Sequence, residues 1–137
     1  MTQLIGLIAL GLTAGFTSGL LGIGGGVILV PALALIFGLP FHKAIGISLA
    51  IIIPTAFSSM LKHYQAGNVD FSFAIVITIF AIIGAWLGAT YSSYLPAATL
   101  KKVFAIFMIA IGFNMLLGLS DKAIQTVKVK NSIQKNI

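Results

Sequence analysis

The fold is decided by the stretch Gly22-Ile23-Gly24-Gly25-Gly26-Val27-Ile28-Leu29-Val30-Pro31, in which four of the first five residues are glycine. Glycine lowers helix stability and adopts positive φ readily, so this stretch predicts a break in a helix. In lipid, a broken backbone is tolerated only where it is buried in protein or lines a water-filled cavity. The N–H groups freed at the start of a following half-helix form a site suited to an anion. We therefore expect the backbone of Gly24, Gly25 and Gly26 to bind a ligand.

Two other interpretations of the glycine cluster compete with a ligand site. Small residues also allow close helix packing without any ligand, and that alternative stays open at this point. A nucleotide site is disfavoured, because the cluster lacks the Gly-Lys-Ser/Thr ending of a phosphate-binding loop and an apolar chain offers no βαβ context.

The composition indicates an integral membrane protein. Of the 137 residues, 59% are hydrophobic and 7% are charged, whereas a soluble domain has about 25% charged residues. The formal net charge of +6 is explained better by lysines at membrane ends than by nucleic-acid binding. There is no cysteine, no His/Asp/Glu set with metal-ligand spacing and no nucleophile–base pair. We expect neither an enzyme nor a cofactor or metal.

Hydropathy predicts an all-α membrane protein with four hydrophobic helical units, the first broken at the glycine cluster. The units cover residues 4–37, 44–61, 71–94 and 101–119. Residues 27–37 are too short for an upright span of about 20 residues, so they either complete a tilted, broken helix or form a re-entrant half-helix. We expect residues 1–119 to form one multi-pass bundle in the cell membrane and residues 120–137 to form a polar, lysine-bearing tail. The N-terminal run is interpreted as a first membrane helix and not as a cleaved signal peptide.

Polar side chains of the second span are the other candidate site residues. His63 is favoured because Ser59 lies one helical turn before it, and Lys62 adds positive charge at the same end of the span. These cations recruit anions in one interpretation and anchor the helix at the interface in the other. The predicted substrate-binding side chains are Ser48, Thr55, Ser58, Ser59, Lys62 and His63.

The motifs resemble the sulfite exporter TauE/SafE family, also called TSUP. They are Gly22-Ile-Gly-Gly-Gly-x-x-x-x-Pro31, Gly38-Leu-Pro-Phe-His-Lys-Ala44, Ile47-Ser-Leu-Ala50, Pro54-Thr55, His63-Tyr64-Gln-x-Gly-Asn-Val-Asp70, Gly84-x-x-x-Gly88 and the Leu-Pro at 95–96. The resemblance implies an inner-membrane protein that moves sulfur-containing anions such as sulfite or sulfonates. Family members usually contain two related halves, each with a glycine motif, and this chain matches one of them.

The leading hypothesis is therefore an anion permease that acts as a homodimer or with a second half-transporter, with its site shared around a two-fold axis. The expected partners are the lipid bilayer and a small anionic substrate, and no nucleic acid. The alternative hypothesis is a non-transporting membrane assembly subunit that requires a different partner half.

Overall fold

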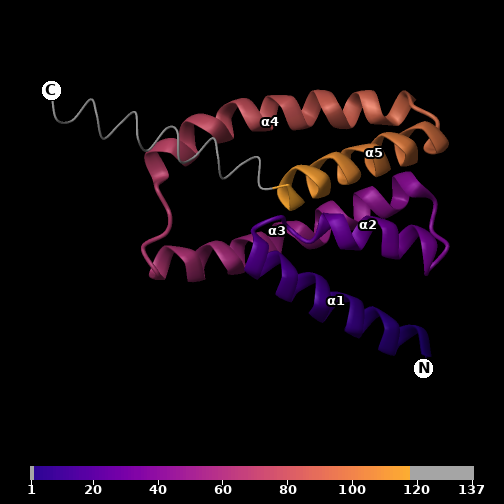
Figure 1. Ribbon diagram of the computed structural model, residues 1–137, viewed down its shortest axis with the longest axis horizontal. Coiled ribbons are helices and arrows are strands. Elements are labelled where there is room, and N and C mark those ends of the chain that lie inside the picture. The colour runs from indigo at the N-terminus through magenta and orange to yellow at the C-terminus, as the bar shows by residue number, and fades with distance from the viewer. Residues whose placement is uncertain (1, 118–137) are drawn as a thin grey trace, which may run out of the picture. The chain divides into compact units, whose positions relative to one another are not determined.

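The computed structural model describes residues 2–117, and the regular structure in this part of the chain is entirely α-helical (Figure 1). The helices are α1 (Thr2–Leu21), α2 (Gly26–Leu35), α3 (Phe41–Gln65), α4 (Phe71–Tyr94) and α5 (Ala97–Leu116). Among the described residues, α1, α3, α4 and α5 are long and apolar enough to cross a membrane, whereas α2 is shorter. The prediction of an all-α membrane protein with a helix broken at the glycine cluster is confirmed.

The helix bounds follow local signals that hydropathy alone does not contain. The predicted bounds of α4 are correct, and Asp70 caps its start by accepting hydrogen bonds from the amides of Ser72 and Phe73. Helix α3 is longer than predicted because a membrane helix continues past its apolar part into the interface, where polar side chains are tolerated. Helix α5 begins before its predicted start because the carbonyl of Pro96 already accepts bonds from the amides of Thr99 and Leu100.

The glycine cluster reverses the direction of the chain. Gly22, Gly24 and Gly25 have φ values of 67°, 73° and 71°, a left-handed conformation that no helical residue has. Gly25 lies against Ala14 in the second half of α1, whereas the ring of Phe37, just beyond α2, lies against Gly6 near the start of α1. Helix α2 therefore runs antiparallel to α1 (Figure 1).

The structure distinguishes between the two predicted paths for residues 27–37. The segment does not continue α1 as a tilted helix; it forms the short half-helix α2, which lies antiparallel to α1. It runs back toward the side on which α1 begins, because three left-handed residues in the loop turn the chain around. Residues 22–40 thus return along α1 in two parts, a glycine loop followed by the half-helix α2.

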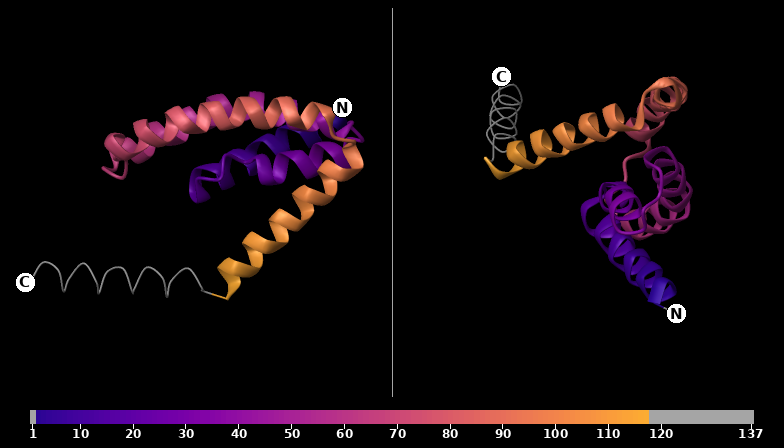
Figure 2. Two further views of the ribbon diagram at one scale, coloured as in Figure 1. Left: turned by 90° about the horizontal axis from the view of Figure 1, so that it is seen from above. Right: turned by 90° about the vertical axis from the view of Figure 1, so that its right-hand side faces the viewer.

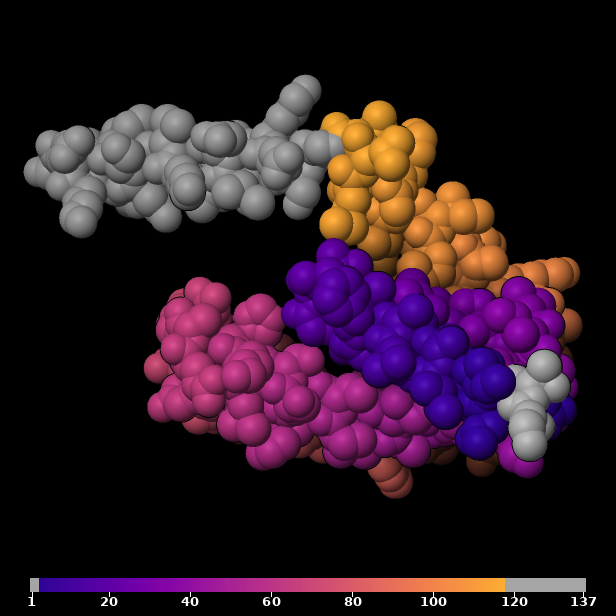
Figure 3. Space-filling view, turned by 90° about the horizontal axis from the view of Figure 1, so that it is seen from below, coloured from indigo at the N-terminus to yellow at the C-terminus, as the bar shows by residue number. Residues whose placement is uncertain are grey.

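Helix α3 then runs parallel to α1 and packs on both preceding helices. His63, near the end of α3, is bonded to the carbonyl of Gly19, near the end of α1. Ile52 in the middle of α3 contacts Gly24 and Gly26, so the glycine loop lies about halfway along α3. The core of this three-helix group is apolar, and its members are Ala14, Leu29, Val30, Ala32, Leu33, Phe41 and Ala44. Figures 2 and 3 show α1, α2 and α3, indigo to magenta, packed side by side.

Helix α4 runs antiparallel to α3. The ring Nε2 of His42, at the start of α3, lies 3.2 Å from the carbonyl oxygen of Ser92 and 3.1 Å from that of Leu95, at the end of α4. The chain divides after Leu100 into two compact units, and the site described below lies wholly in the first. The predicted polar tail, residues 120–137, lies outside the described residues.

Candidate functional site

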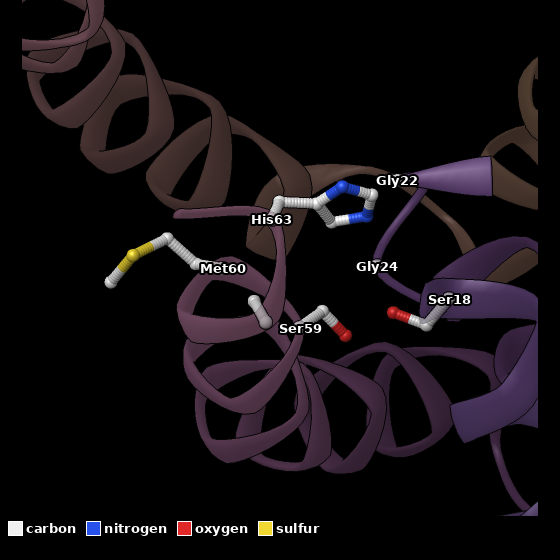
Figure 4. A pocket seen from close by; sticks show the side chains of 7 residues that line it. Ser18, Gly22, Gly24, Ser59, Met60 and His63 are labelled. Carbon is white, nitrogen blue, oxygen red and sulfur yellow. The ribbon is translucent and has the colours of Figure 1, made fainter. Parts of the chain in front are cut away.

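A cavity of about 210 Å³ opens where the end of α1, the glycine loop and the second half of α3 meet (Figure 4). It is lined by Ser18, Gly22, Gly24, Ala56, Ser59, Met60 and His63. Ser18 and Gly22 are one helical turn apart at the end of α1, and Ser59 and His63 are one turn apart on α3. The cavity thus lies between the middle of α3 and its C-terminal end, on the side of the loop away from α2.

The glycine loop presents backbone N–H groups that have no acceptor. Among the described residues, the amides of Ile23, Gly24 and Gly25 donate no hydrogen bond, whereas the Gly25 carbonyl accepts from the amides of Ile28 and Leu29 in the first turn of α2. The first N–H groups of α2 lack an intrahelical acceptor as well. Together they give the start of α2 a partial positive charge equivalent to about +0.5 of an elementary charge. This end of the helix is suited to an anion.

His63 joins the two helices that border the cavity. Its ring Nε2 lies 3.1 Å from the carbonyl oxygen of Gly19. A carbonyl oxygen only accepts, so Nε2 carries the hydrogen and donates it. The bond satisfies one of the carbonyls that the end of α1 leaves without an intrahelical donor. The second ring nitrogen, Nδ1, is left for a ligand or solvent.

The structure brings together three of the nine predicted substrate-binding residues on the cavity wall, Gly24, Ser59 and His63. Gly25 and Gly26 complete the same loop but pack against Ala14 and Ile52. Gly25 and Gly26 therefore hold the backbone of the loop in place and do not line the cavity.

The remaining predicted side chains lie elsewhere on α3. The hydroxyls of Ser48 and Thr55 donate to carbonyls of their own helix, 2.8 Å to Ile45 and 2.9 Å to Ile51. Lys62 is exposed, and its Nζ lies 3.4 Å from Oε1 of Gln65. Ser58 is exposed and does not line the cavity.

Ser18, Gly22, Ala56 and Met60 line the cavity but are not among the predicted site residues. The available signal is the four-residue spacing of Ser18–Gly22, Ala56–Met60 and Ser59–His63, which places each pair on one face of its helix. The spacing does not predict which face of α1 packs against which face of α3. Among residues 2–117, no group of three or more His, Asp or Glu side chains is placed to hold a metal ion.

A half-helix preceded by a glycine loop that lines a cavity inside an apolar helical bundle is an arrangement typical of membrane transporters. The family model described as "Sulfite exporter TauE/SafE" matches residues 7–136 of the chain. The chain belongs to this family, and the resemblance inferred from its motifs is confirmed.

Curated relatives are named as probable membrane transporters. The protein YdhB of Bacillus subtilis is 34% identical over 99 residues, which cover 71% of this chain and 40% of the relative. A second B. subtilis protein, YunE, is 32% identical over 109 residues, 80% of this chain and 40% of the relative. MJ0441 of Methanocaldococcus jannaschii is 33% identical over 110 residues, 76% and 41% of the two chains. The chain therefore spans about two fifths of the length of these relatives. No solved structure matches it significantly.

Proposed function

We propose that this chain is a permease of the cell membrane for small anions, with sulfur oxyanions and sulfonates as its substrate class. The observation that carries the proposal is the glycine loop, in which Gly24, whose amide is unpaired, lines a cavity near the start of α2. Backbone amides are suited to this role because they offer fixed donors without placing a full charge inside the membrane. The substrate class follows from the family, and the loop supplies groups that bind oxyanions.

The charges near the cavity favour an anion as well. Asp70 is the one acidic residue in the described part of the chain, and its carboxylate is engaged in capping α4. On the cavity side, His63 lies on the wall and Lys62 precedes it by one residue on α3. The His63 ring keeps its second nitrogen, Nδ1, available to a ligand or to a water that bridges to it. An entering anion then meets attraction and no fixed negative charge.

We further propose that transport requires a second repeat half, supplied by a second copy of this chain. Two-fold related repeats with a site at their interface are a recurring design of secondary transporters. The exposed, apolar α4, which buries no residue in this chain, leaves surface for such a partner. A non-transporting role in an assembly with a different protein is the competing outcome.

The test is anion uptake by the purified chain in proteoliposomes, with radiolabelled sulfite as substrate and sulfate, thiosulfate and methanesulfonate as competitors. We expect saturable uptake that the competitors inhibit. The chain's two histidines provide matched variants, because each bonds a helix carbonyl but only His63 lines the cavity. His63→Leu should lower kcat/KM by about tenfold or more, as expected when a charged ligand loses a hydrogen-bonding partner.

His42→Leu, normalised to the amount of folded protein, should stay within about twofold of wild type, a change well below the loss of one such hydrogen bond. Equal losses of kcat/KM in the two variants would mean that the histidines act through helix packing and not through contact with the ligand. Absence of saturable uptake by well-folded wild-type protein would contradict the permease assignment and favour the assembly subunit.

A further inference from the structure

Seven helical hydroxyl groups in the described residues are bonded within their own helix. Each donates to a carbonyl three or four residues earlier in its own helix, at 2.7–3.1 Å; these residues are Thr13, Thr17, Ser48, Thr55, Thr78, Thr90 and Ser93. Such bonds are the usual solution for a hydroxyl in an apolar environment, because an unpaired polar group there costs free energy.

The hydroxyls of two cavity-lining serines, Ser18 and Ser59, form no such bond, as is also true of Ser58, Ser72, Ser92 and Thr99 elsewhere in the described helices. Ser18 is only 3% exposed, yet its hydroxyl forms no hydrogen bond within the described part of the chain. No fully enclosed side-chain oxygen or nitrogen in that part lacks a partner, so the Ser18 hydroxyl reaches the cavity surface. Ser59, from α3, likewise forms no hydrogen bond there. Figure 4 shows the two hydroxyl oxygens pointing toward each other across the cavity.

The position of Ser18 explains why its hydroxyl is free. The Ala14 carbonyl, its acceptor one turn earlier, is already bonded by the hydroxyl of Thr17 at 3.1 Å. The same carbonyl is covered by the glycine loop, since a Cβ on Gly25 would lie 3.0 Å from its oxygen. The loop therefore covers one of the two carbonyls to which a helical serine at this position donates, and the Ser18 hydroxyl lies at the cavity instead.

We propose that Ser18 and Ser59 form a hydroxyl pair that binds the anion from two helices at once, each donating to a different oxygen of it. This inference rests on the proposed function and deepens it by naming specificity-determining residues. The preferred ligand is an anion with at least two acceptor oxygens, such as a sulfate or sulfonate group. A cavity of about 210 Å³ has room for such a group and several waters, each of which occupies about 30 Å³.

The pair also connects the loop to the ligand. Ser18 and Gly24, whose amide is unpaired, both line the cavity. Ser59 lies one turn from His63 on the opposite wall. A ligand bound between the two serines is therefore held by both α1 and α3.

The experiment measures anion binding to purified protein by calorimetry, with sulfate and methanesulfonate as probes. The matched variants are Ser18→Ala and Ser48→Ala, because both serines are buried, at 3% and 2% exposure, but Ser48 is bonded to its own helix. Ser18→Ala should raise Kd about tenfold, the effect of one hydrogen bond to a charged group. Ser48→Ala should leave Kd within about twofold, since it removes no donor that faces the cavity.

The double variant tests whether both hydroxyls hold one ligand. Combining Ser18→Ala with Ser59→Ala should raise Kd by a factor that differs from the product of the two single-variant factors. The effects of groups that share a binding partner are not additive in free energy. Wild-type Kd in Ser18→Ala, or an equal increase in Ser48→Ala, would overturn the inference. Binding is measured without transport, so this result is independent of the uptake assay that judges the proposed function.

Discussion

At the scale of single residues, the glycine loop is fixed by steric limits at Gly25. Its φ of 71° is left-handed, a conformation that costs a residue with a Cβ about 1–2 kcal/mol. A Cβ there would also lie 3.0 Å from the backbone oxygen of Ala14, which cannot move without distorting α1. Glycine is thus required at this position for both conformation and space.

Gly25→Ala should therefore lower the free energy of unfolding by about 1–2 kcal/mol or more and should strongly reduce anion uptake. The measurements are thermal unfolding in detergent and uptake in proteoliposomes. Gly11→Ala is the matched control, because Gly11 is helical and a Cβ added to it would meet no atom within 4 Å; it should leave both unchanged or raise stability slightly. A Gly25→Ala protein with wild-type uptake would show that the loop conformation is not needed.

At the residue scale, part of the candidate site could be predicted from the sequence. Gly24, Ser59 and His63, which line the cavity, were proposed from local signals, a glycine cluster and the spacing of one helical turn. Ser18 was not among the predicted site residues. Whether a serine hydroxyl can bind a ligand depends on whether it already has an acceptor within the protein. That depends on Thr17 and on the returning loop, which covers the Ala14 carbonyl, and no local pattern contains this information.

At the scale of elements, α2 is a half-helix whose starting point is set by α3. Ile52, near the middle of α3, contacts both Gly24 and Gly26, at 3.3 Å and 3.0 Å from where their Cβ atoms would be. This side chain holds the loop, and hence the positive end of α2, about halfway along α3. Together with the packing of Gly25 on Ala14, this contact fixes where α2 begins.

Ile52→Ala should release the loop from α3. We expect a loss of about 1 kcal/mol or more in stability, from the deleted methyl groups and the space they leave, together with a higher KM for anion uptake. The neighbouring residue Ile53 is 73% exposed, and Ile53→Ala should change neither quantity appreciably. If the two variants behave alike in unfolding and uptake experiments, Ile52 does not position the loop.

The existence of the apolar helices was predictable at this scale, but the path between them was not. Length and hydropathy identified the four long helices, since about 20 apolar residues are needed to cross a bilayer. The sequence left open whether residues 27–37 continue the first helix or form a returning half-helix, because glycines indicate a break in a helix but not the direction of the chain after it. The direction results from three left-handed residues and from packing against Ala14 and Ile52.

At the scale of the whole molecule, much of the apolar surface has no protein neighbour within the described part of the chain. Helix α4 buries no residue, and its side chain Trp86 is 71% exposed. In a bilayer, lipid covers such a surface at no cost, and a second copy of the chain is the protein partner that the proposed function requires.

Amine-reactive crosslinking in native membranes tests this partner. Lys43, Lys62, Lys101 and Lys102 are exposed on the described residues and provide reactive sites without any substitution. The expected product has twice the 14.3 kDa mass of the chain and contains peptides of this chain alone. Products that consistently contain a different membrane protein would contradict the homodimer and support the assembly subunit.

The central claim is that the cavity beside the glycine loop is the anion site. Its most direct measurement is an experimental structure with bound selenate, a sulfate analogue whose selenium is located by anomalous scattering. We predict one selenium peak inside the cavity, with selenate oxygens within hydrogen-bonding distance of the Gly24 amide and the hydroxyls of Ser18 and Ser59. A cavity that contains only water at saturating selenate, or a peak elsewhere on the chain, would contradict the claim.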